Sequence, residues 1–365
     1  MLAQVATGRP ASIPNVTADG APDRLLAARV LRDEAEREGF TRFGIARAER
    51  PPRFERYERW VAAGLHAGMR YLEDTLAERS TPASILSGAR SVVCLAAPHA
   101  REPWRGPDGA RYARYARGSD YHGSLRERAA RVVAGARMRL PGAWEGRVCV
   151  DSTPIAERAF AAAAGLGWIG KNGCLIDPVQ GSYLLLAEIV TDLDLPEDAP
   201  MAEQCGSCTR CLESCPTGAL AAPAVLDASR CIAYWTIEHA GPVPDAVKAT
   251  LGHHVFGCDV CQEVCPWNAP LAVRAAPNAD EPAHEPAPSR KDVLAMGRGA
   301  WRRRFGKTAV NRAARRGLQR NAAVSAGVVG DRACLPELRR AAALSEAGLA
   351  DAARWAADRL DGVPL

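Results

Sequence analysis

The sequence predicts an α/β core, a cysteine-rich module and an all-helical tail, in that order along 365 residues. Three observations support this prediction. Segments of helical and of extended periodicity alternate over roughly residues 22–196, as they do in α/β folds. Eight of the twelve cysteines then lie between Cys205 and Cys265. From Arg290 onward the apolar pattern is almost entirely helical.

The spacing of apolar residues gives the elements of the core. Apolar positions recur with helical periodicity in four stretches, and short apolar runs such as SVVCLAA, which begins at Ser91, indicate buried strands. In chain order we expect a helix over Asp23–Glu38, a strand over Phe40–Ala46, helical stretches to about Arg79, a strand over Ser91–Ala97, a helix over Tyr121–Leu140, a strand over Arg147–Val150, a helix over Pro154–Ala164 and a strand over Ser182–Thr191.

Composition sets the broad class and the domain limits. The chain is 47% hydrophobic and 24% charged, which is ordinary for a globular protein. No apolar run approaches the roughly eighteen residues that span a bilayer, and the polar opening carries no Arg-Arg export pair, so we expect a cytoplasmic protein without membrane contact. The expected segments are a disordered N-terminus (1–21), the α/β domain (22–196), the cysteine-rich domain (197–275), a linker rich in Pro, Ala and acids (276–289) and the helical domain (290–365).

The cysteines form two runs of one pattern. The first reads CGSCTRCLESCP from Cys205 to Pro216, the C-x2-C-x2-C-x3-C-P arrangement of bacterial ferredoxins. The second reads CDVCQEVCP from Cys258 to Pro266, with its remaining cysteine displaced upstream to Cys231. Two such runs predict two [4Fe–4S] clusters close enough to exchange electrons, because the last cysteine of each run ligates the other cluster.

This geometry assigns the ligands. We expect one cluster on Cys205, Cys208, Cys211 and Cys265, and the other on Cys215, Cys231, Cys258 and Cys261. A zinc site is the first alternative, but zinc needs only two C-x2-C pairs and no Cys-Pro tails. A disulfide framework is the second, and it is disfavoured in a chain without a secretory apolar segment.

The helical tail has two notable features. Segments beginning at Leu318 and at Asp351 resemble paired HEAT-type helices, with a plain helical bundle as the alternative. The stretch from Arg290 to Arg320 carries eleven basic residues against Asp292 alone. Such a block attracts a phosphate backbone, although a solvated helix face explains a charge run equally simply.

Three tempting motifs are rejected. GLGWIG from Gly165 to Gly170 matches the dinucleotide fingerprint, but a helix rather than a strand leads into it. The same segment fails as a P-loop, because Asn172 stands where Ser or Thr binds magnesium. Asp120-Tyr-His122 begins like the D-x-H-x-x-G motif that ligates the cobalt of cobalamin, but Leu125 replaces its glycine.

Asp151 is the candidate catalytic residue. It directly follows the strand expected over Arg147–Val150, at the edge of the sheet where α/β proteins bind ligands. The alternative is that this aspartate serves the N-terminus of the next helix, because Ser-Thr-Pro follows it.

Several short sequence motifs occur together in one order along the chain. They are YARYARGSDYH from Tyr112, VDSTP from Val150, GLGWIGKN from Gly165, RCIAYWTIE from Arg230 and GCDVCQEVCPWN from Gly257. With Gly181-Ser182 and the cysteine runs they cover most of residues 22–275. Because it carries these motifs, the chain resembles the epoxyqueuosine reductase family.

The resemblance implies a fold, a reaction and its cofactors. The core is expected to be a cobalamin-binding α/β unit, like that of nitroreductases and reductive dehalogenases, beside a ferredoxin-type module with two [4Fe–4S] clusters. Base-off cob(II)alamin and the clusters are expected to reduce the epoxide of epoxyqueuosine to queuosine at the wobble position of tRNA anticodons, the last step of queuosine biosynthesis. The family's proton donor carries over to Asp151, for which we expect a raised pKa.

The resemblance also suggests contacts and partners. Cobalamin is expected to contact Arg114, Asp151, Lys171, Asn172 and Ser182, without an axial histidine from the protein. The substrate tRNA is expected to bind the basic tail through Arg302, Arg303, Arg304, Arg315 and Arg316. An external electron donor, either a reductase with flavodoxin or a ferredoxin, and a monomeric state are expected as well. Cys94, Cys149, Cys174 and Cys334 are expected to be structural.

Two other functions compete with this one. A cobalamin-dependent reductive dehalogenase uses the same cofactors, but usually carries an export signal and no basic tail. An electron-transfer ferredoxin module with an RNA-binding tail is the non-enzyme alternative, and it predicts that no corrin binds.

Overall fold

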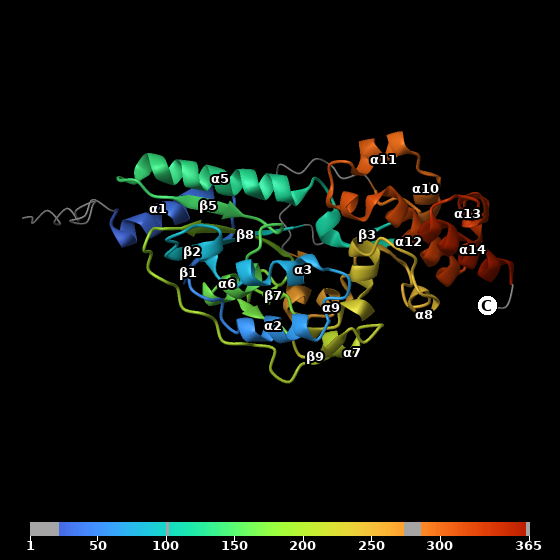
Figure 1. Ribbon diagram of the computed structural model, residues 1–365, viewed down its shortest axis with the longest axis horizontal. Helices are drawn as coiled ribbons and strands as arrows, with labels where there is room; N and C mark the ends of the chain where they lie inside the picture. Colours follow the sequence, from blue (N-terminus) through green and yellow to red (C-terminus); the bar gives the residue numbers. More distant parts are fainter. Residues whose placement is uncertain (1–21, 100–101, 274–285, 363–365) are drawn as a thin grey trace, which may run out of the picture.

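The computed structural model describes residues 22–99, 102–273 and 286–362. The expected N-terminal segment (1–21) and most of the expected linker (276–289) lie outside these residues. Figure 1 shows an elongated molecule, with the α/β core at one end, the C-terminal helices at the other and the cysteine-rich segments between them.

The core is built on a four-stranded sheet. Its strands are β1 (Arg42–Arg47), β2 (Ser91–Pro98), β8 (Leu184–Thr191) and β5 (Gly146–Cys149), in the order β1-β2-β8-β5. All neighbouring pairs are antiparallel. The predicted strand positions are therefore correct within two residues, but the ligand crevice of a parallel sheet, used above to interpret Asp151, does not apply here.

Helices cover both faces of this sheet (Figure 1). On one face α1 (Arg24–Arg37) and α5 (Tyr121–Arg139) bury Leu31 and Leu125 against Val93 and Leu95 of β2. On the other face α6 (Glu157–Ala163) buries Phe160 in a separate apolar cluster. Successive residues of β2 point to opposite faces of the sheet, and helices cover both faces. Every residue from Ser91 to Ala97 is therefore buried.

The predicted helical stretch before residue 79 consists of three short helices. They are α2 (Phe54–Ala62), α3 (Tyr71–Asp74) and α4 (Leu76–Arg79). The rejected dinucleotide fingerprint lies in a hairpin of β6 (Trp168–Ile169) and β7 (Leu175–Ile176). A Cβ on Gly167 would lie 2.1 Å from the carbonyl oxygen of Ile176, so this glycine permits close packing of the hairpin's main chain.

The cysteine-rich module contains little regular structure. Each cysteine run includes one short helix, α7 (Arg210–Glu213) or α9 (Val260–Glu263), and the two helices contact each other. Between the runs lie the hairpin β9 (Leu220–Ala222) with β10 (Val225–Leu226), the π-helix η4 (Tyr234–Glu238), α8 (Asp245–Lys248) and β11 (His254–Phe256).

A second sheet crosses the predicted domain limits. Strand β11 pairs with β4 (Arg111–Tyr112), which pairs with β3 (Trp104–Arg105). The segment around β3 and β4, which we expected in the α/β domain, thus packs in one apolar cluster with β11 and the C-terminal helices. The predicted domain limits stay a prediction, and the two faces of the four-stranded sheet keep apolar clusters of their own.

The tail is helical as predicted. It consists of α10 (Arg290–Ala295), α11 (Arg298–Phe305), α12 (Ala314–Val329), α13 (Leu335–Ala342) and α14 (Ala347–Asp361). Helix α12 is central, because it contacts α10, α14 and β11. Its residues Leu318 to Gly327 are all buried.

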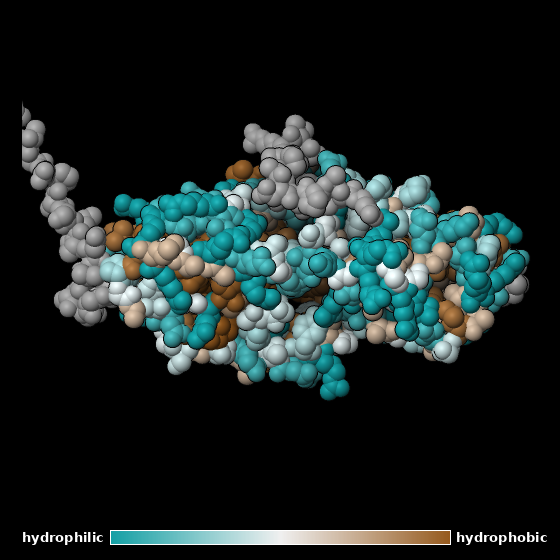
Figure 2. All heavy atoms as spheres, turned by 90° about the horizontal axis from the view of Figure 1, so that it is seen from above, coloured by the Kyte–Doolittle hydropathy of each residue, from teal (hydrophilic) through white to brown (hydrophobic). Residues whose placement is uncertain are grey.

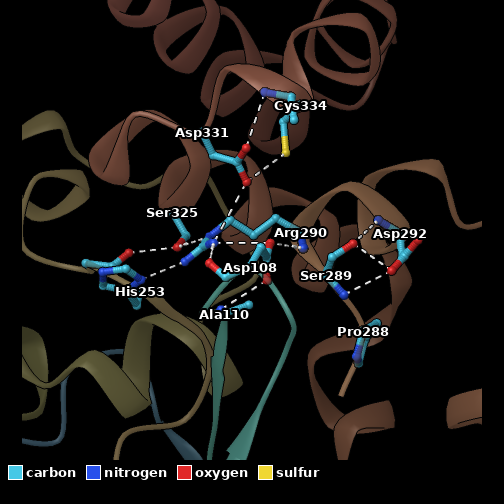
Figure 3. Close-up of polar contacts among 12 residues, drawn as sticks. Asp108, Ala110, His253, Pro288, Ser289, Arg290, Asp292, Ser325, Asp331 and Cys334 are labelled. Carbon is cyan, nitrogen blue, oxygen red and sulfur yellow. Dashed lines mark hydrogen bonds and ion pairs between the residues drawn. The ribbon is translucent and has the colours of Figure 1, made fainter. Parts of the chain in front are cut away.

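The basic block is not a single surface. Arg290 is fully buried (0% exposed), and Figure 3 shows its guanidinium group between Asp108, His253 and Ser325. Its Nη1 lies 3.1 Å from Asp108 Oδ2, and its Nε donates to Ser325 Oγ (2.8 Å). Arg290 therefore joins the tail to the segment before β4.

Arg320 is buried as well, and its two Nη groups donate to the main-chain oxygens of Trp235, His239 and Gly241. Arg290 and Arg320 thus make hydrogen bonds in the protein interior. The interpretation of the whole basic block as an RNA surface is wrong for these two residues.

The outer surface is mainly polar. Figure 2 shows hydrophilic residues over most of the face seen from above, with apolar residues scattered between them. In the described ranges, no helix has both the length and the apolar character needed to cross a membrane.

Candidate active site and cysteine groups

Asp151 meets the first turn of α5. It follows β5, and its side chain is half exposed. Its Oδ2 accepts a hydrogen bond from the Tyr121 hydroxyl (3.0 Å) and lies 2.5 Å from Nε2 of His122. The sheet and the helix above it thus bring Asp151 next to Tyr121 and His122, which lie about thirty residues earlier in the chain.

Both ring nitrogens of His122 face carboxylates. Nδ1 lies 2.6 Å from Oδ1 of Asp120, the residue that caps α5 by accepting the His122 main-chain N–H. The hydrogen bond to Asp151 is the largest cause that raises the pKa of His122. The hydrogen bond from His122 is in turn the largest cause that lowers the pKa of Asp151.

The expected raised pKa of Asp151 is therefore wrong for this arrangement. An imidazole within hydrogen-bond distance stabilises the carboxylate more than burial destabilises it. The raised pKa of His122 and the lowered pKa of Asp151 both favour an ion pair in which the imidazole holds the proton. His122 is not among the residues predicted for the site, because Asp120-Tyr-His122 resembles only a cobalt-ligating motif and its contact with Asp151 depends on the fold.

The turn that carries Asp151 is strained. Asp151 has φ of +49°, a left-handed conformation that costs a residue with a Cβ about 1–2 kcal/mol. Its main-chain N–H donates to Oε1 of Glu157 at the start of α6 (2.5 Å). This hydrogen bond holds the strained turn in place.

The C-terminal tail reaches the same site. The Arg312 guanidinium lies 5.8 Å from the ring centre of Tyr71, and it binds Glu238 of η4 through two hydrogen bonds (3.3 and 2.6 Å). The charge of Arg312 also contributes to the lowered pKa of Asp151. Segments distant in sequence thus meet at Arg312, whose charge acts on Asp151.

Aromatic contacts connect the aspartate with the second cysteine run. Tyr121 packs edge-on against Tyr115 (5.9 Å between ring centres), and Tyr115 lies 6.2 Å from Phe256, two residues before Cys258. Burial is the main cause that raises the pKa of Tyr115, followed by the charges of Asp151, Glu238 and Asp259. Tyr115 therefore lies between the active-site turn and the cysteine-rich module.

The first cysteine group consists of Cys205, Cys208, Cys211 and Cys265. Burial raises the pKa of Cys265, and the neighbouring thiols of Cys205 and Cys208 raise it further. Burial, followed by Cys205 and Cys265, raises the pKa of Cys211 in the same way. The fourth thiol of the second run thus joins the first three thiols of the first run.

The second cysteine group consists of Cys215, Cys231, Cys258 and Cys261. Burial raises the pKa of Cys258 to about 12, and the charges of Cys231 and Cys215 add to the effect of burial. Burial also raises the pKa of Cys261, followed by Cys174, Cys258 and Cys231. The thiols of this set thus lie close enough for their charges to act on one another, and the assignment of either set as cluster ligands stays a prediction.

The cysteines fit iron–sulfur clusters better than the alternatives. All twelve are free thiols. In the described part of the chain no three His, Cys, Asp or Glu side chains converge closely enough for a single metal ion, whereas a cubane holds its thiolates further apart. The main-chain N–H of Ala219 donates to Cys215 Sγ (3.3 Å), a bond of the kind that tunes cluster sulfurs.

Lys171 and Asn172 contact the cysteine loops. Lys171 Nζ donates to the main-chain oxygens of Gly206 (2.7 Å) and Cys208 (2.9 Å), and Asn172 Nδ2 donates to that of Cys261 (3.5 Å). These bonds tie the β6–β7 hairpin to both runs. Contact of either residue with cobalamin stays a prediction.

Ser182 and Arg114 also join the core to the module. Ser182 Oγ donates to Gln262 Oε1 (2.8 Å), and Arg114 Nη2 donates to Glu263 Oε1 (2.9 Å). Arg114 Nη1 donates to the Tyr183 hydroxyl (2.6 Å). The Nε atoms of Arg114 and Arg117, however, are buried without a hydrogen-bond partner among the described residues.

The five predicted RNA-contacting arginines divide into two sets. Arg302, Arg303 and Arg304 lie on α11, the first two exposed and Arg304 half-buried. Arg315 and Arg316 of α12 are half-buried; both donate to Gln319 Oε1, and Arg316 pairs with Glu346 (2.7 Å). The exposed set on α11 is thus the more accessible one.

Comparisons with known proteins agree on one family. The family described as "Epoxyqueuosine reductase QueG, DUF1730" matches residues 79–152, and "4Fe-4S double cluster binding domain" matches residues 204–268. The epoxyqueuosine reductase of Xanthomonas campestris pv. campestris is 42% identical over 268 residues, which cover 72% of this chain and 74% of that protein. That of Gloeobacter violaceus is 40% identical over 83% of this chain and 97% of its own length. The chain belongs to the epoxyqueuosine reductase family.

Solved structures of epoxyqueuosine reductases have the same fold. One, bound to an epoxyqueuosine-modified tRNA-Tyr stem loop, has a TM-score of 0.83 at 28% identity and covers 93% of this chain and 91% of its own. Another, from Bacillus subtilis, has its catalytic aspartate loop swung out of the active site, with a TM-score of 0.80, 28% identity and the same coverage.

Family membership decides between the functions considered. An epoxyqueuosine reductase is an oxidoreductase, so the electron-transfer module without catalysis is disfavoured, and so is the dehalogenase. The double cluster domain covers both cysteine groups, so the chain binds two [4Fe–4S] clusters.

Proposed function

We propose that this chain reduces the epoxide of epoxyqueuosine within a tRNA anticodon, with the His122–Asp151 pair as its proton donor. The observation that supports this role most is the short contact between Nε2 of His122 and Oδ2 of Asp151 on a strained turn. A solved relative has its catalytic aspartate loop swung out of the active site. A strained, hydrogen-bonded turn is suited to such movement.

The pair can hold and deliver one proton. The contact with Asp151 raises the pKa of His122, so the imidazole would hold the proton and the carboxylate would keep it next to the site. As the epoxide oxygen gains negative charge, a proton donor within hydrogen-bond distance lowers the free energy of the transition state. Tyr121, whose pKa is raised chiefly by burial, keeps its hydroxyl proton and orients Asp151.

We assign the cluster ligands as the two cysteine groups. Cys205, Cys208, Cys211 and Cys265 would hold one cluster, and Cys215, Cys231, Cys258 and Cys261 the other. The clusters, when bound, relay single electrons from an external donor. The second group lies on the Tyr115 side, so its cluster is the better placed of the two to serve the active site.

Cobalamin fits the donors that remain unpaired. Its amide side chains and its nucleotide phosphate accept hydrogen bonds, and the buried Nε atoms of Arg114 and Arg117 are donors without a partner among the described residues. With Asp151, Lys171, Asn172 and Ser182 as further contacts, they would hold base-off cob(II)alamin. When bound, this cofactor supplies low-potential reduction of a C–O bond. His122 is engaged on both sides and is not expected to be an axial ligand.

The tRNA is proposed to bind the tail. A relative binds an epoxyqueuosine-modified stem loop. The exposed arginines of α11 suit a phosphate backbone, and Arg312 brings the tail to the active site. We infer a HEAT-like pairing of α12 with α14, a monomeric and cytoplasmic protein, and a flavodoxin or ferredoxin as donor.

The decisive experiment is anaerobic turnover of an epoxyqueuosine-containing tRNA by the protein reconstituted with clusters, with and without cobalamin. Formation of queuosine only when both cofactors are present is the expected result. Turnover without cobalamin contradicts the cofactor assignment, and full turnover by Asp151→Asn contradicts the proton donor.

A further inference from the structure

An unpaired glutamate lies in the centre of the four-stranded sheet. Glu188 of β8 is opposite Cys94 of β2 and Cys149 of β5. Its side chain is fully buried, and neither carboxyl oxygen has a hydrogen-bond partner among the described residues. The flanking thiols donate instead to main-chain oxygens of their own strands. Because an ionised, unpaired carboxylate is very unfavourable in such a place, Glu188 is protonated at neutral pH.

A second acid contacts the catalytic turn and lies on the helix that packs against the strand of Glu188. Glu157 begins α6, which packs against β8, and its Oε1 accepts the main-chain N–H of Asp151 (2.5 Å). Burial, followed by the charge of Asp151, raises the pKa of Glu157 to about 7. Burial also raises the pKa of Glu188, followed by the charges of Glu157 and Asp151. Glu157 is only half-buried, whereas Glu188 is enclosed.

No cation neutralises this pair of acids directly among the described contacts. Arg79 and Arg158 are the cations whose charges lower the pKa of Glu157. Both guanidinium groups donate to main-chain oxygens, Arg79 to Ile155 (3.2 Å) and Arg158 to Gly173 (2.5 Å). The groups that face Glu188 from β2 and β5 are neutral thiols, because burial raises the pKa of Cys94 and that of Cys149.

The reaction needs more protons than the catalytic pair holds. Conversion of an epoxide to an alkene breaks two C–O bonds, forms the C=C double bond and releases the oxygen as water. It therefore consumes two electrons, which come from the external low-potential reductant, and two protons. The His122–Asp151 pair shares a single proton, because Asp151 is its ionised partner. One further proton is required in each turnover.

We propose that Glu157 and Glu188 form a proton store that supplies the second proton of each turnover to Asp151. This rests on the proposed role of the His122–Asp151 pair as proton donor. After the pair has protonated the departing oxygen, Glu157 gives its proton to Asp151. Glu188 then replaces the proton of Glu157, and solvent refills the store through the half-buried Glu157. Glu157 has a second effect, because its hydrogen bond positions the Asp151 turn.

Glutamine variants separate the two effects. Glu157→Gln can still accept the Asp151 N–H through its amide oxygen, but it cannot donate a carboxyl proton, whereas Glu157→Ala loses both functions. Glu188→Gln keeps the shape of the side chain and removes its acidic proton. The holoenzyme, reconstituted with clusters and cobalamin, is assayed on an epoxyqueuosine-bearing anticodon stem loop between about pH 6 and pH 9.

For the wild-type protein we expect kcat to fall as the pH rises through about 7, the pKa of Glu157. Glu157→Gln and Glu188→Gln should each lower kcat about tenfold or more at pH 6–7, leave KM unchanged and abolish this fall. Wild-type kcat in Glu188→Gln overturns the proposal. A lower kcat with the fall retained does so too, because it indicates a structural role. If Asp151→Asn keeps turnover, the result contradicts the assignment of the His122–Asp151 pair as proton donor, and not the role of Glu157 and Glu188 as a proton store.

A measurement on the wild-type protein does not depend on folding of any variant. Infrared difference spectra through a single turnover should show loss of a protonated-carboxyl band and its recovery from solvent, with a shift in D2O. The absence of any carboxyl change during turnover overturns the store.

Discussion

Nε2 of His122 lies 2.5 Å from Oδ2 of Asp151, so the first turn of α5 and the end of β5 share one proton. Neither residue alone explains the protonation of this site, because each shifts the pKa of the other. The contact supports the proposed role of the pair as the acid of the active site.

Loss of the imidazole should abolish proton delivery. We expect His122→Phe to lower kcat by about 10²–10⁴-fold, the usual contribution of a positioned acid, with unchanged iron and cobalamin content. Tyr121→Phe is the matched control, because it removes a hydrogen bond to the same oxygen but no titratable proton at neutral pH, and it should cost far less. Equal losses in both variants contradict the assignment of the proton to His122.

The same pair should contribute to stability in a limited pH window. The pKa of Asp151 is lowered, so its contribution is present above the ordinary carboxyl pKa of 3.8 and is lost as the pH falls through the lowered value. The pKa of His122 is raised, so its contribution is present below 6.5 and is lost as the pH rises through the raised value. A double-mutant cycle of melting temperatures should show greatest coupling between about pH 4 and 6.5, and constant coupling from pH 3 to 9 contradicts this.

Single cysteine replacements should remove one cluster at a time. Cys211→Ser and Cys231→Ser each take a ligand from a different cysteine group, so each should lower the iron content from roughly eight to roughly four per chain. Cys174→Ser, a neighbour of both groups, is the control and should keep both clusters. Iron analysis and electron paramagnetic resonance distinguish these outcomes. Full iron content in Cys231→Ser shows that the displaced cysteine is not a ligand.

The exposed arginines of α11 should set the salt dependence of tRNA binding. Replacing Arg302, Arg303 and Arg304 by alanine is expected to weaken binding at low salt and to lower the slope of log affinity against log salt by up to about three. A matched triple variant of the exposed core arginines Arg29, Arg137 and Arg147 removes the same charge and should have little effect. Equal effects of the two triple variants mean that net charge alone drives binding.

Arg290 should stabilise the tail rather than bind tRNA. Arg290→Met removes a buried partner of Asp108, Ser325 and His253 and should destabilise the protein by about 3–5 kcal/mol. Thermal unfolding measures this loss, and the salt slope of tRNA binding should stay that of the wild type. A changed slope with unchanged melting temperature contradicts the buried role.

Local sequence patterns predicted much of this protein. The cysteine spacing predicted the two groups of four, because a ligand run must wrap around its own cluster within a few residues. Strand β2 and helix α5 were predicted within one residue at each end, since apolar periodicity reflects burial on one or two faces. The left-handed φ of Asp151 and its bond to Glu157, in contrast, carry no such pattern.

The sequence by itself determined the family, the double cluster domain and the position of Asp151 after a strand. Only the tertiary structure decided that the sheet is antiparallel, that His122 shares the proton of Asp151 and that Arg290 and Arg320 are buried. It also revealed the buried Glu188, without a hydrogen-bond partner among the described residues, in the centre of the sheet. The reason is physical: spacing along the chain fixes contacts within a few residues, whereas the protonation and burial of a charged side chain depend on groups that only the folded chain brings together.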